Sequence, residues 1–208
     1  MTGLIITGTD TDIGKTVVAS MLTLALNGCY FKPIQCGIEP ETDVDTVKRL
    51  TGLGDDRVLP TPIVLSQPRS PHLAAELDNV TIDVDQLAPP SGSLIVEGAG
   101  GLMVPIDRHT LYIDVFARWQ KPVVLVAKSE LGTLNHTLLS LEALAARNIK
   151  VLGVVLVGDD NPDNAKTIAE MGHANILGRV PKLPQINPVV LLKVFADHFK
   201  PSDFGGFS

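Results

Sequence analysis

Short, almost wholly apolar runs alternate along this chain with stretches in which apolar residues recur every three or four positions. A short apolar run is typical of a strand buried on both faces, and the three-to-four spacing is typical of an amphipathic helix. The predicted strands cover residues 4–7, 29–31, 94–96, 122–127, 151–157 and 176–177. The predicted helices cover residues 17–26, 43–51, 72–77, 112–119, 134–147, 163–170 and 188–199. This alternation predicts an α/β fold, a three-layer, doubly wound and mostly parallel sheet covered by helices.

Two segments depart from the pattern. Residues 53–92 are rich in proline, which predicts loops around one short helix. Residues 200–208 contain Gly205-Gly206, which predicts a flexible tail. The length of 208 residues suits one domain, which we place at residues 1–208.

The segment between the first predicted strand and the first predicted helix carries the strongest chemical signal. It reads Gly8-Thr9-Asp10-Thr11-Asp12-Ile13-Gly14-Lys15-Thr16. A strand, a glycine loop and a helix N-terminus together direct backbone N–H groups and the positive end of the helix dipole at one point, where phosphate binds. In such a loop the lysine reaches the β- and γ-phosphates and the threonine hydroxyl holds Mg²⁺, which assigns these roles to Lys15 and Thr16.

Two carboxylates, Asp10 and Asp12, stand where a polyphosphate is expected. Like charges at close range are unfavourable unless positive charge intervenes. Two explanations remain open: the side chains face solvent or cap the helix, or at least one faces a cationic second substrate such as an amine.

Two charged residues, Glu97 and Lys32, stand at or after predicted strands, where ligand groups gather in a parallel sheet, and a third, Asp45, lies near the start of a predicted helix. Glu97 follows an apolar strand and precedes Gly98-Ala99-Gly100-Gly101, which favours a second Mg²⁺ ligand over a solvated side chain. Lys32 can place positive charge on a phosphoryl group or a substrate carboxylate, or can be a surface lysine. Asp45 can complete the metal shell or simply complement the dipole of its helix.

Composition narrows the partners. The formal net charge of −6 argues against nucleic acid or an anionic membrane, and no apolar run is long enough to span a bilayer. No signal peptide fits ahead of a strand that begins near Leu4. The two cysteines, Cys29 and Cys36, form no metal-binding pattern, so we expect reduced thiols and a cytoplasmic protein.

Several further motifs occur in a specific order. They are Lys32-Pro33-Ile34-Gln35-Cys36-Gly37, Ser70-Pro71-His72, Val96-Glu97-Gly98-Ala99-Gly100-Gly101 and Leu131-Gly132-Thr133-Leu134-Asn135-His136. With the phosphate loop they closely resemble the dethiobiotin synthetase family, over residues 4–199. The resemblance implies a P-loop NTPase fold and an ATP- and Mg²⁺-dependent reaction. In it, 7,8-diaminopelargonate and CO₂ give dethiobiotin through a carbamate and a carbamic-phosphoric anhydride, in biotin biosynthesis.

The resemblance also implies roles for individual residues. The catalytic set would be Lys15, Lys32 and Thr11, and the metal set Thr16, Asp45 and Glu97. The nucleotide would contact Asp12, Ile13, Gly14, Lys15, Thr16, Val17, Glu97, Gly100, Pro181 and Leu183. The diamine or its carbamate would contact Thr11, Asp12, Lys32 and Cys36. The family is similar in forming homodimers, in which a neighbouring chain would bind the substrate's tail carboxylate through Gly132, Thr133, Leu134 and Asn135.

Two positions depart from the family pattern. The family usually has Ser or Thr where Cys36 stands, and a thiol is a weaker hydrogen-bond donor, so we expect a small loss of turnover. Many relatives have Asn where Gly158 stands, an amide that reads the adenine edge. We therefore expect ATP to serve as cosubstrate, with weakened discrimination against other nucleoside triphosphates.

Other classes remain to be weighed. A dimerising switch ATPase of the Min/Par type typically carries an extra lysine near the start of the loop, where this chain has Thr9 and Asp10. An amidoligase of the cobyrinate kind usually has an added glutaminase domain, for which the chain is too short. A nucleotide-dependent binding module without turnover can be distinguished from an enzyme only by an assay.

Overall fold

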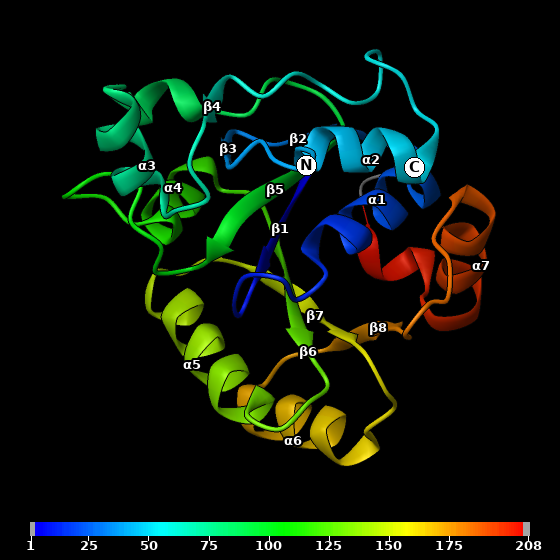
Figure 1. The fold of residues 1–208 in the computed structure, drawn as a ribbon. Helices are drawn as coiled ribbons and strands as arrows, with labels where there is room; N and C mark the ends of the chain where they lie inside the picture. Colours follow the sequence, from blue (N-terminus) through cyan, green and yellow to red (C-terminus); the bar gives the residue numbers. More distant parts are fainter. Residues whose placement is uncertain (1–2, 206–208) are drawn as a thin grey trace.

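The computed structural model describes residues 3–205, and a parallel sheet lies at its centre (Figure 1). Within this part of the chain six strands run side by side in the order β2-β5-β1-β6-β7-β8, all parallel. Their bounds are β1 Gly3–Gly8, β2 Cys29–Phe31, β5 Leu94–Gly101, β6 Val123–Lys128, β7 Val151–Val157 and β8 Ile176–Val180. The α/β prediction, with a doubly wound and mostly parallel sheet, is confirmed.

Helices cover both faces of this sheet because successive strand residues point to opposite sides. On β1, Leu4 and Ile6 pack in one core cluster with residues of α1, α2 and α7, whereas Ile5 packs in another with residues of α3, α4 and α5. Figure 1 shows α1, α2 and α7 on one side of the sheet and α5 and α6 on the other. The helices are α1 Lys15–Ala25, α2 Asp43–Thr51, α3 Pro71–Asp78, α4 Tyr112–Trp119, α5 Thr133–Ala146, α6 Pro162–Gly172 and α7 Pro188–His198. None of the helices in residues 3–205 is both long and apolar enough to cross a membrane.

A second, small parallel sheet was not predicted. Strands β3 (Ile34–Cys36) and β4 (Ile63–Leu65) pair with each other beside the main sheet. Each has three residues, and the polar Gln35 interrupts the apolar run of β3, whereas the prolines around β4 favour a loop. The proline-rich segment also forms α3, as predicted, and a 3₁₀ helix, η1, at Val84–Leu87.

The prediction of a flexible tail is wrong for the part that the structure describes. A 3₁₀ helix, η2, forms at Pro201–Phe204, and the Phe204 side chain is 1% exposed. Its ring lies 5.8 Å from that of Phe195 and 6.3 Å from that of Phe199 on α7. Burial of the Phe204 ring stabilises the fold by about 2 kcal/mol, and this orders the segment despite the flexibility of the neighbouring glycines. Residues 206–208 of the predicted tail lie outside the described residues.

Candidate nucleotide and substrate site

The phosphate loop connects β1 to α1 and has the conformation that its sequence predicts. Gly14 adopts a left-handed φ of 96° and caps α1, and its carbonyl accepts a hydrogen bond from Val18 N at 3.0 Å. A side chain at Gly8 would collide with Ile13, so the loop can fold back on the strand only with glycine there. The first turn of α1, with Lys15, Thr16 and Val17, therefore directs its N–H groups into the loop.

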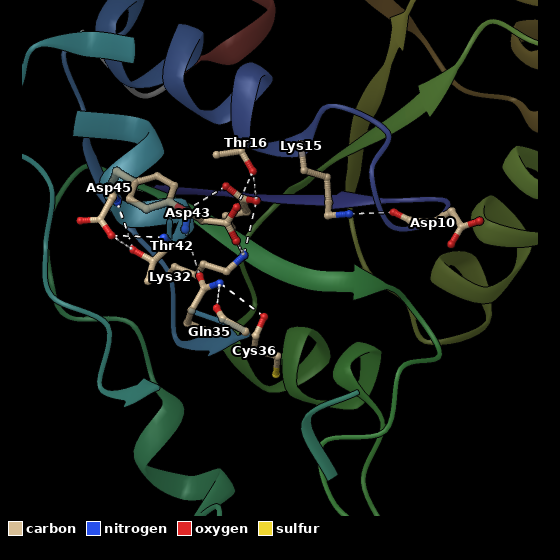
Figure 2. A network of polar contacts seen from close by, with 12 residues as sticks. Asp10, Lys15, Thr16, Lys32, Gln35, Cys36, Thr42, Asp43 and Asp45 are labelled. Carbon is tan, nitrogen blue, oxygen red and sulfur yellow. Dashed lines mark hydrogen bonds and ion pairs between the residues drawn. The ribbon is translucent and has the colours of Figure 1, made fainter. Parts of the chain in front are cut away.

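Lys15 lies inside this loop, largely buried. Its ammonium donates a hydrogen bond to the carbonyl oxygen of Asp10 at 2.7 Å (Figure 2). Burial lowers the pKa of Lys15, and the positive charge of Lys32 adds to that effect, although Glu97 and Asp43 oppose it. A phosphate would restore a full counter-charge to this ammonium, so Lys15 is placed to exchange its carbonyl partner for a ligand.

Four polar side chains from four elements meet beside the loop, as Figure 2 shows for the labelled members. The Lys32 ammonium lies 2.6 Å from Asp43 Oδ2 and 3.4 Å from Glu97 Oε1. The Thr16 hydroxyl lies 3.0 Å from Asp43 Oδ1 and 2.9 Å from Glu97 Oε1. The single hydroxyl proton can serve only one of these acceptors at a time. We call Thr16, Lys32, Asp43 and Glu97 the charged cluster.

The register of the sheet explains this meeting. Phe31 of β2 pairs with Val96 of β5, so the next residues, Lys32 and Glu97, lie alongside each other. Ile6 of β1 pairs with Glu97, immediately before the phosphate loop. Glu97 lies within β5 rather than at its end, because the glycine-rich run 98–101 continues the strand.

Charges in the cluster shift one another's protonation. Burial opposes the charged form of Lys32, but Glu97 and Asp43 outweigh it and raise the pKa of this ammonium. Burial likewise works against ionised Asp43, yet Lys32 and the Thr16 hydroxyl bring its pKa below the usual value. For Glu97, burial prevails and raises the pKa, with Lys32 offsetting part of the rise. The cluster thus holds two carboxylates around one buried cation.

The metal role predicted for Asp45 does not fit its position. Asp45 is exposed, and its carboxylate accepts hydrogen bonds from Thr42 N at 3.2 Å and from the Thr42 hydroxyl at 2.6 Å. The Thr42 hydroxyl accepts one from Asp45 N at 3.2 Å, which completes a capping box at the start of α2. Asp45 therefore plays the alternative role, that of a first-turn acid.

Asp43, rather than Asp45, lies in the charged cluster. It is the first residue of α2 and lies on the same face as the buried Val47 and Leu50, at positions i, i+4 and i+7. That spacing was available in the sequence and could have selected Asp43. Its backbone N–H also donates to the Gln35 amide oxygen at 3.2 Å.

Gln35 is a further residue that the sequence prediction missed. It is buried on β3, and its amide nitrogen donates to Gly37 O at 2.9 Å, while its amide oxygen accepts from Asp43 N (Figure 2). One side chain thereby links the turn after β3 to the start of α2.

The structure brings some predicted substrate residues near the cluster. A Cβ at Gly100 on β5 would lie 3.7 Å from the Thr11 hydroxyl oxygen, so the end of β5 adjoins the phosphate loop. Cys36 ends β3 and is half-buried, and burial raises the pKa of its thiol to about 11. Asp10 and Asp12 are both exposed on the loop. Contact of Thr11, Asp12 and Cys36 with a substrate stays a prediction.

The segment predicted to contact the nucleotide base begins at Pro181, directly after β8, and lies next to the end of β7. Gly158 follows β7 with φ 125°, and its N–H donates to Val180 O at 2.9 Å, immediately before Pro181. A Cβ at Gly14 would lie 3.1 Å from Val157 Cγ1, so this segment borders the loop. A Cβ at Gly158 would lie 2.7 Å from the Ser129 hydroxyl oxygen, so the backbone and Ser129 together favour glycine there. Base contacts by Pro181 and Leu183 stay a prediction.

The loop predicted to serve a neighbouring chain begins α5. Gly132 caps the helix with φ 94°, Leu131 before it is fully exposed, and Asn135 is also exposed. Thr133 is buried, with its hydroxyl 3.3 Å from that of Thr137. These positions leave the loop accessible, and the role of Gly132, Thr133, Leu134 and Asn135 across a dimer interface stays a prediction.

Magnesium fits the charged cluster by the nature of its donors. Mg²⁺ takes oxygen ligands, usually one or two carboxylates together with water and phosphate oxygens. Asp43, Glu97 and the Thr16 hydroxyl supply such oxygens beside the phosphate loop. The cluster has two such carboxylates, and nowhere in residues 3–205 do three or more His, Cys, Asp or Glu side chains gather to hold a metal without a ligand's help.

The fold and the loop define the class of this protein, a P-loop nucleotide-binding protein. A family model described as an AAA domain matches residues 2–190. A ParA family ATPase from Chlorobium tepidum TLS superposes with a TM-score of 0.57 at 11% identity, covering 88% of this chain and 84% of that one. This likeness concerns the fold alone.

Two relatives are far more similar in sequence, and both are named ATP-dependent dethiobiotin synthetase BioD. One, from Rhodopseudomonas palustris (strain TIE-1), is 55% identical over 205 residues, 98% of this chain and 97% of its own. The other, from Brucella anthropi, is 54% identical over 206 residues, again 98% of this chain and 97% of its own. The chain belongs to the ATP-dependent dethiobiotin synthetase family.

Proposed function

We propose that this protein is a dethiobiotin synthase that uses ATP and Mg²⁺ to close 7,8-diaminopelargonate and CO₂ into the cyclic urea of dethiobiotin. The observation that carries the proposal is the charged cluster beside the phosphate loop, in a chain that matches dethiobiotin synthetases over 98% of its length. The oxygens of such a cluster can hold Mg²⁺ beside the Lys32 ammonium, and these two cations would neutralise charge on a transferring phosphoryl group, which is what phosphoryl transfer chiefly requires of a protein.

The reaction has three steps. One amine of the substrate adds to CO₂ and loses a proton, which gives a carbamate. A carbamate oxygen then attacks the γ-phosphorus and ADP leaves, which gives the carbamic-phosphoric anhydride. Finally the second amine attacks the carbamoyl carbon, the C–O bond to phosphate breaks, and the urea ring closes with release of phosphate and a proton.

The residues supply charge and position for these steps. Lys15 would leave the Asp10 carbonyl and bind the β- and γ-phosphates. When bound, Mg²⁺ neutralises charge on the phosphates, and its protein ligands would be Thr16, Asp43 and Glu97. Lys32 would face the γ-phosphoryl oxygens and the carbamate, with its ammonium charge maintained by the two adjacent carboxylates.

The acidic side of the loop suits a diamine. Asp10 and Asp12 are exposed next to the phosphate-binding backbone, and Thr11 lies between them beside Gly100. A substrate with two amines bears the positive charge that these carboxylates favour. We propose that Thr11 and Asp12 contact the diamine or its carbamate, that Cys36 lies near the carbamate, and that Gly132, Thr133, Leu134 and Asn135 of a partner chain bind the tail carboxylate in a homodimer.

We also propose that residues 1–208 form one domain and that the protein is cytoplasmic. Its partners would be small molecules and not nucleic acid or a membrane. The net charge of −6 and the free Cys29 and Cys36 support this. A Min/Par-type switch is disfavoured because Thr9 and Asp10 stand where such proteins typically carry a lysine.

One assay tests the function. The protein is incubated with 7,8-diaminopelargonate, bicarbonate, Mg²⁺ and ATP, and dethiobiotin and phosphate are measured together. We expect equal amounts of both products. ATP hydrolysis that ignores the diamine would refute the proposal and favour a switch ATPase.

Matched lysine variants test the assigned roles. Lys15→Ala and Lys32→Ala should each abolish dethiobiotin formation, because each removes charge from the site. Lys166→Ala is the control, since Lys166 is exposed on α6 and lies 3.9 Å from Glu170. Full turnover by Lys32→Ala would show that its role is wrongly assigned.

A further inference from the structure

A buried phenol binds the carboxylate oxygen of Glu97 that Thr16 and Lys32 leave unbound. The hydroxyl of Tyr30 donates to Glu97 Oε2 at 2.9 Å. The other oxygen, Oε1, faces the Thr16 hydroxyl at 2.9 Å and the Lys32 ammonium at 3.4 Å. The two oxygens of this carboxylate therefore have separate partners. The hydrogen bond from Tyr30 to Oε2 leaves Oε1 to face Thr16 and Lys32.

The backbone of Tyr30 is itself held tightly. Tyr30 lies on β2, paired with Ile95, and is fully buried. On the open side of β2 its N–H donates to Arg57 O at 2.8 Å, and its carbonyl accepts from Leu59 N at 2.9 Å. A side chain with two χ angles on so constrained a backbone has little freedom, so its hydroxyl is preorganised toward Glu97.

A purely structural reading is that Glu97 merely satisfies a buried hydroxyl. A second buried tyrosine, in the other core cluster of the fold, argues against that need. Tyr112 is also fully buried, and its hydroxyl has no hydrogen-bond partner within residues 3–205. The fold thus accommodates a buried phenol that no protein group in residues 3–205 binds, whereas a carboxylate that is 1% exposed is costly unless its oxygens are bound.

We propose that Tyr30 is a positioning residue that orients Glu97 as a ligand of the Mg²⁺ site. By binding Oε2 it presents Oε1 beside Thr16 and Asp43. Partners of ligating carboxylates tune metal affinity in this way, and their loss typically lowers it by about 10- to 100-fold. The inference rests on the proposed function, because that function places Mg²⁺ at these residues.

The test compares two single-atom deletions. Tyr30→Phe removes the hydroxyl that binds Glu97, and Tyr112→Phe removes a hydroxyl of the same kind without a partner. Mn²⁺ serves as the probe for Mg²⁺, and its binding to the protein in the presence of ADP is followed by electron paramagnetic resonance. ADP binding without metal is measured separately, and every titration is run well below the unfolding midpoint of the variant.

We expect Tyr30→Phe to weaken Mn²⁺ binding by about 10- to 100-fold, with metal-free ADP binding unchanged. Turnover of this variant should recover largely at high Mg²⁺, as a rise in the KM for Mg²⁺ more than a fall in kcat. Tyr112→Phe should bind Mn²⁺ as the wild type does. Wild-type affinity in Tyr30→Phe, or an equal loss in Tyr112→Phe, would overturn the inference.

The outcomes separate this inference from the proposed function. If the wild type forms dethiobiotin and binds Mn²⁺ but Tyr30→Phe equals it, only the role of Tyr30 fails. If the wild type forms no dethiobiotin, the proposed function fails. If it binds no Mn²⁺ with ADP present, the metal site and the role of Tyr30 both fail.

Discussion

Replacing Lys32 by methionine should destabilise the protein strongly, because Lys32 is the buried cation between two carboxylates. Lys32 is 3% exposed, and it lies 2.6 Å from Asp43 and 3.4 Å from the buried Glu97. Methionine keeps an unbranched apolar stem but removes the charge. Removing one partner of a buried ion pair costs about 3–5 kcal/mol, because the other charge is left uncompensated.

The expected loss translates into a measurable midpoint. For a chain of 208 residues, each kcal/mol lowers the unfolding midpoint by about 2–4 °C, so Lys32→Met should unfold roughly 6–20 °C below the wild type. In the wild type Lys32 holds the folded-state pKa of Asp43 below the unfolded value, a contribution present at neutral pH and lost as pH falls through the folded pKa. The contribution of Asp43 to the gap between the two proteins should therefore stay constant near pH 7 and be lost only below about pH 4, where Asp43 becomes protonated.

Magnesium should restore part of this loss. Without Lys32, the oxygens of Asp43 and Glu97 would keep only the weaker influence of the Lys15 ammonium, and a divalent cation can supply the missing positive charge. A cation that binds only the folded state stabilises it by about 2.7 kcal/mol at a concentration 100 times its Kd. Mg²⁺ should thus raise the midpoint of Lys32→Met more than that of the wild type.

Thermal unfolding by circular dichroism, with and without Mg²⁺ at constant ionic strength, checks both statements. Lys166→Met is the control, because it removes an exposed lysine whose pair with Glu170 contributes at most a few tenths of a kcal/mol. The reasoning is refuted if Lys32→Met unfolds within about 2 °C of the wild type, or if Mg²⁺ favours it no more than the wild type.

Four other predictions concern Phe204, Cys36, Gly158 and the choice of nucleotide. Phe204→Ala should destabilise the fold by about 3–4 kcal/mol, because the ring packs on α7, and an unchanged denaturation midpoint would contradict this. Because burial raises the pKa of Cys36 to about 11, its alkylation near pH 8 should be at least about tenfold slower than that of a free thiol and should keep rising with pH; mass spectrometry of its peptide checks the rate, and a plateau below about pH 9 would oppose it. Gly158→Asn should cost about 1–2 kcal/mol through its φ of 125° alone, and Ser129→Ala in the same chain should remove the additional collision. Wild-type protein should use other nucleoside triphosphates within about tenfold of ATP, and a hundredfold preference for ATP in the product assay would contradict that.

The sequence predicted the main sheet well because its strands are buried on both faces and its loop motif is rigidly specified. Residues such as Ile5 and Val124 lie in continuous apolar runs that suit a parallel sheet and little else. The phosphate loop was predictable for a related reason, since Gly8 and Gly14 occupy positions that exclude or disfavour a side chain.

Prediction failed where tertiary contacts decide between neighbours. Asp43 and Asp45 are both acids in the first turn of α2, and Asp43 lies on Lys32 because it shares the packed face of the helix with Val47 and Leu50, a spacing that the prediction did not use. The short strands β3 and β4 were missed because Gln35 interrupts the apolar run of β3 and prolines surround β4. Phe204 is ordered because it packs on α7, a contact that the glycines after it do not reveal.

The amide of Gln35 has one more consequence, for how this region can vary among relatives. It joins Gly37 directly to Asp43, so residues 38–42 form a loop whose two ends are held together without it. Lengthening a loop whose ends are already fixed adds little entropy cost, only about 0.6 kcal/mol for each doubling. Insertions or deletions between residues 38 and 41 should therefore accumulate in evolution while the spacing of Lys32 and Asp43 in space stays constant.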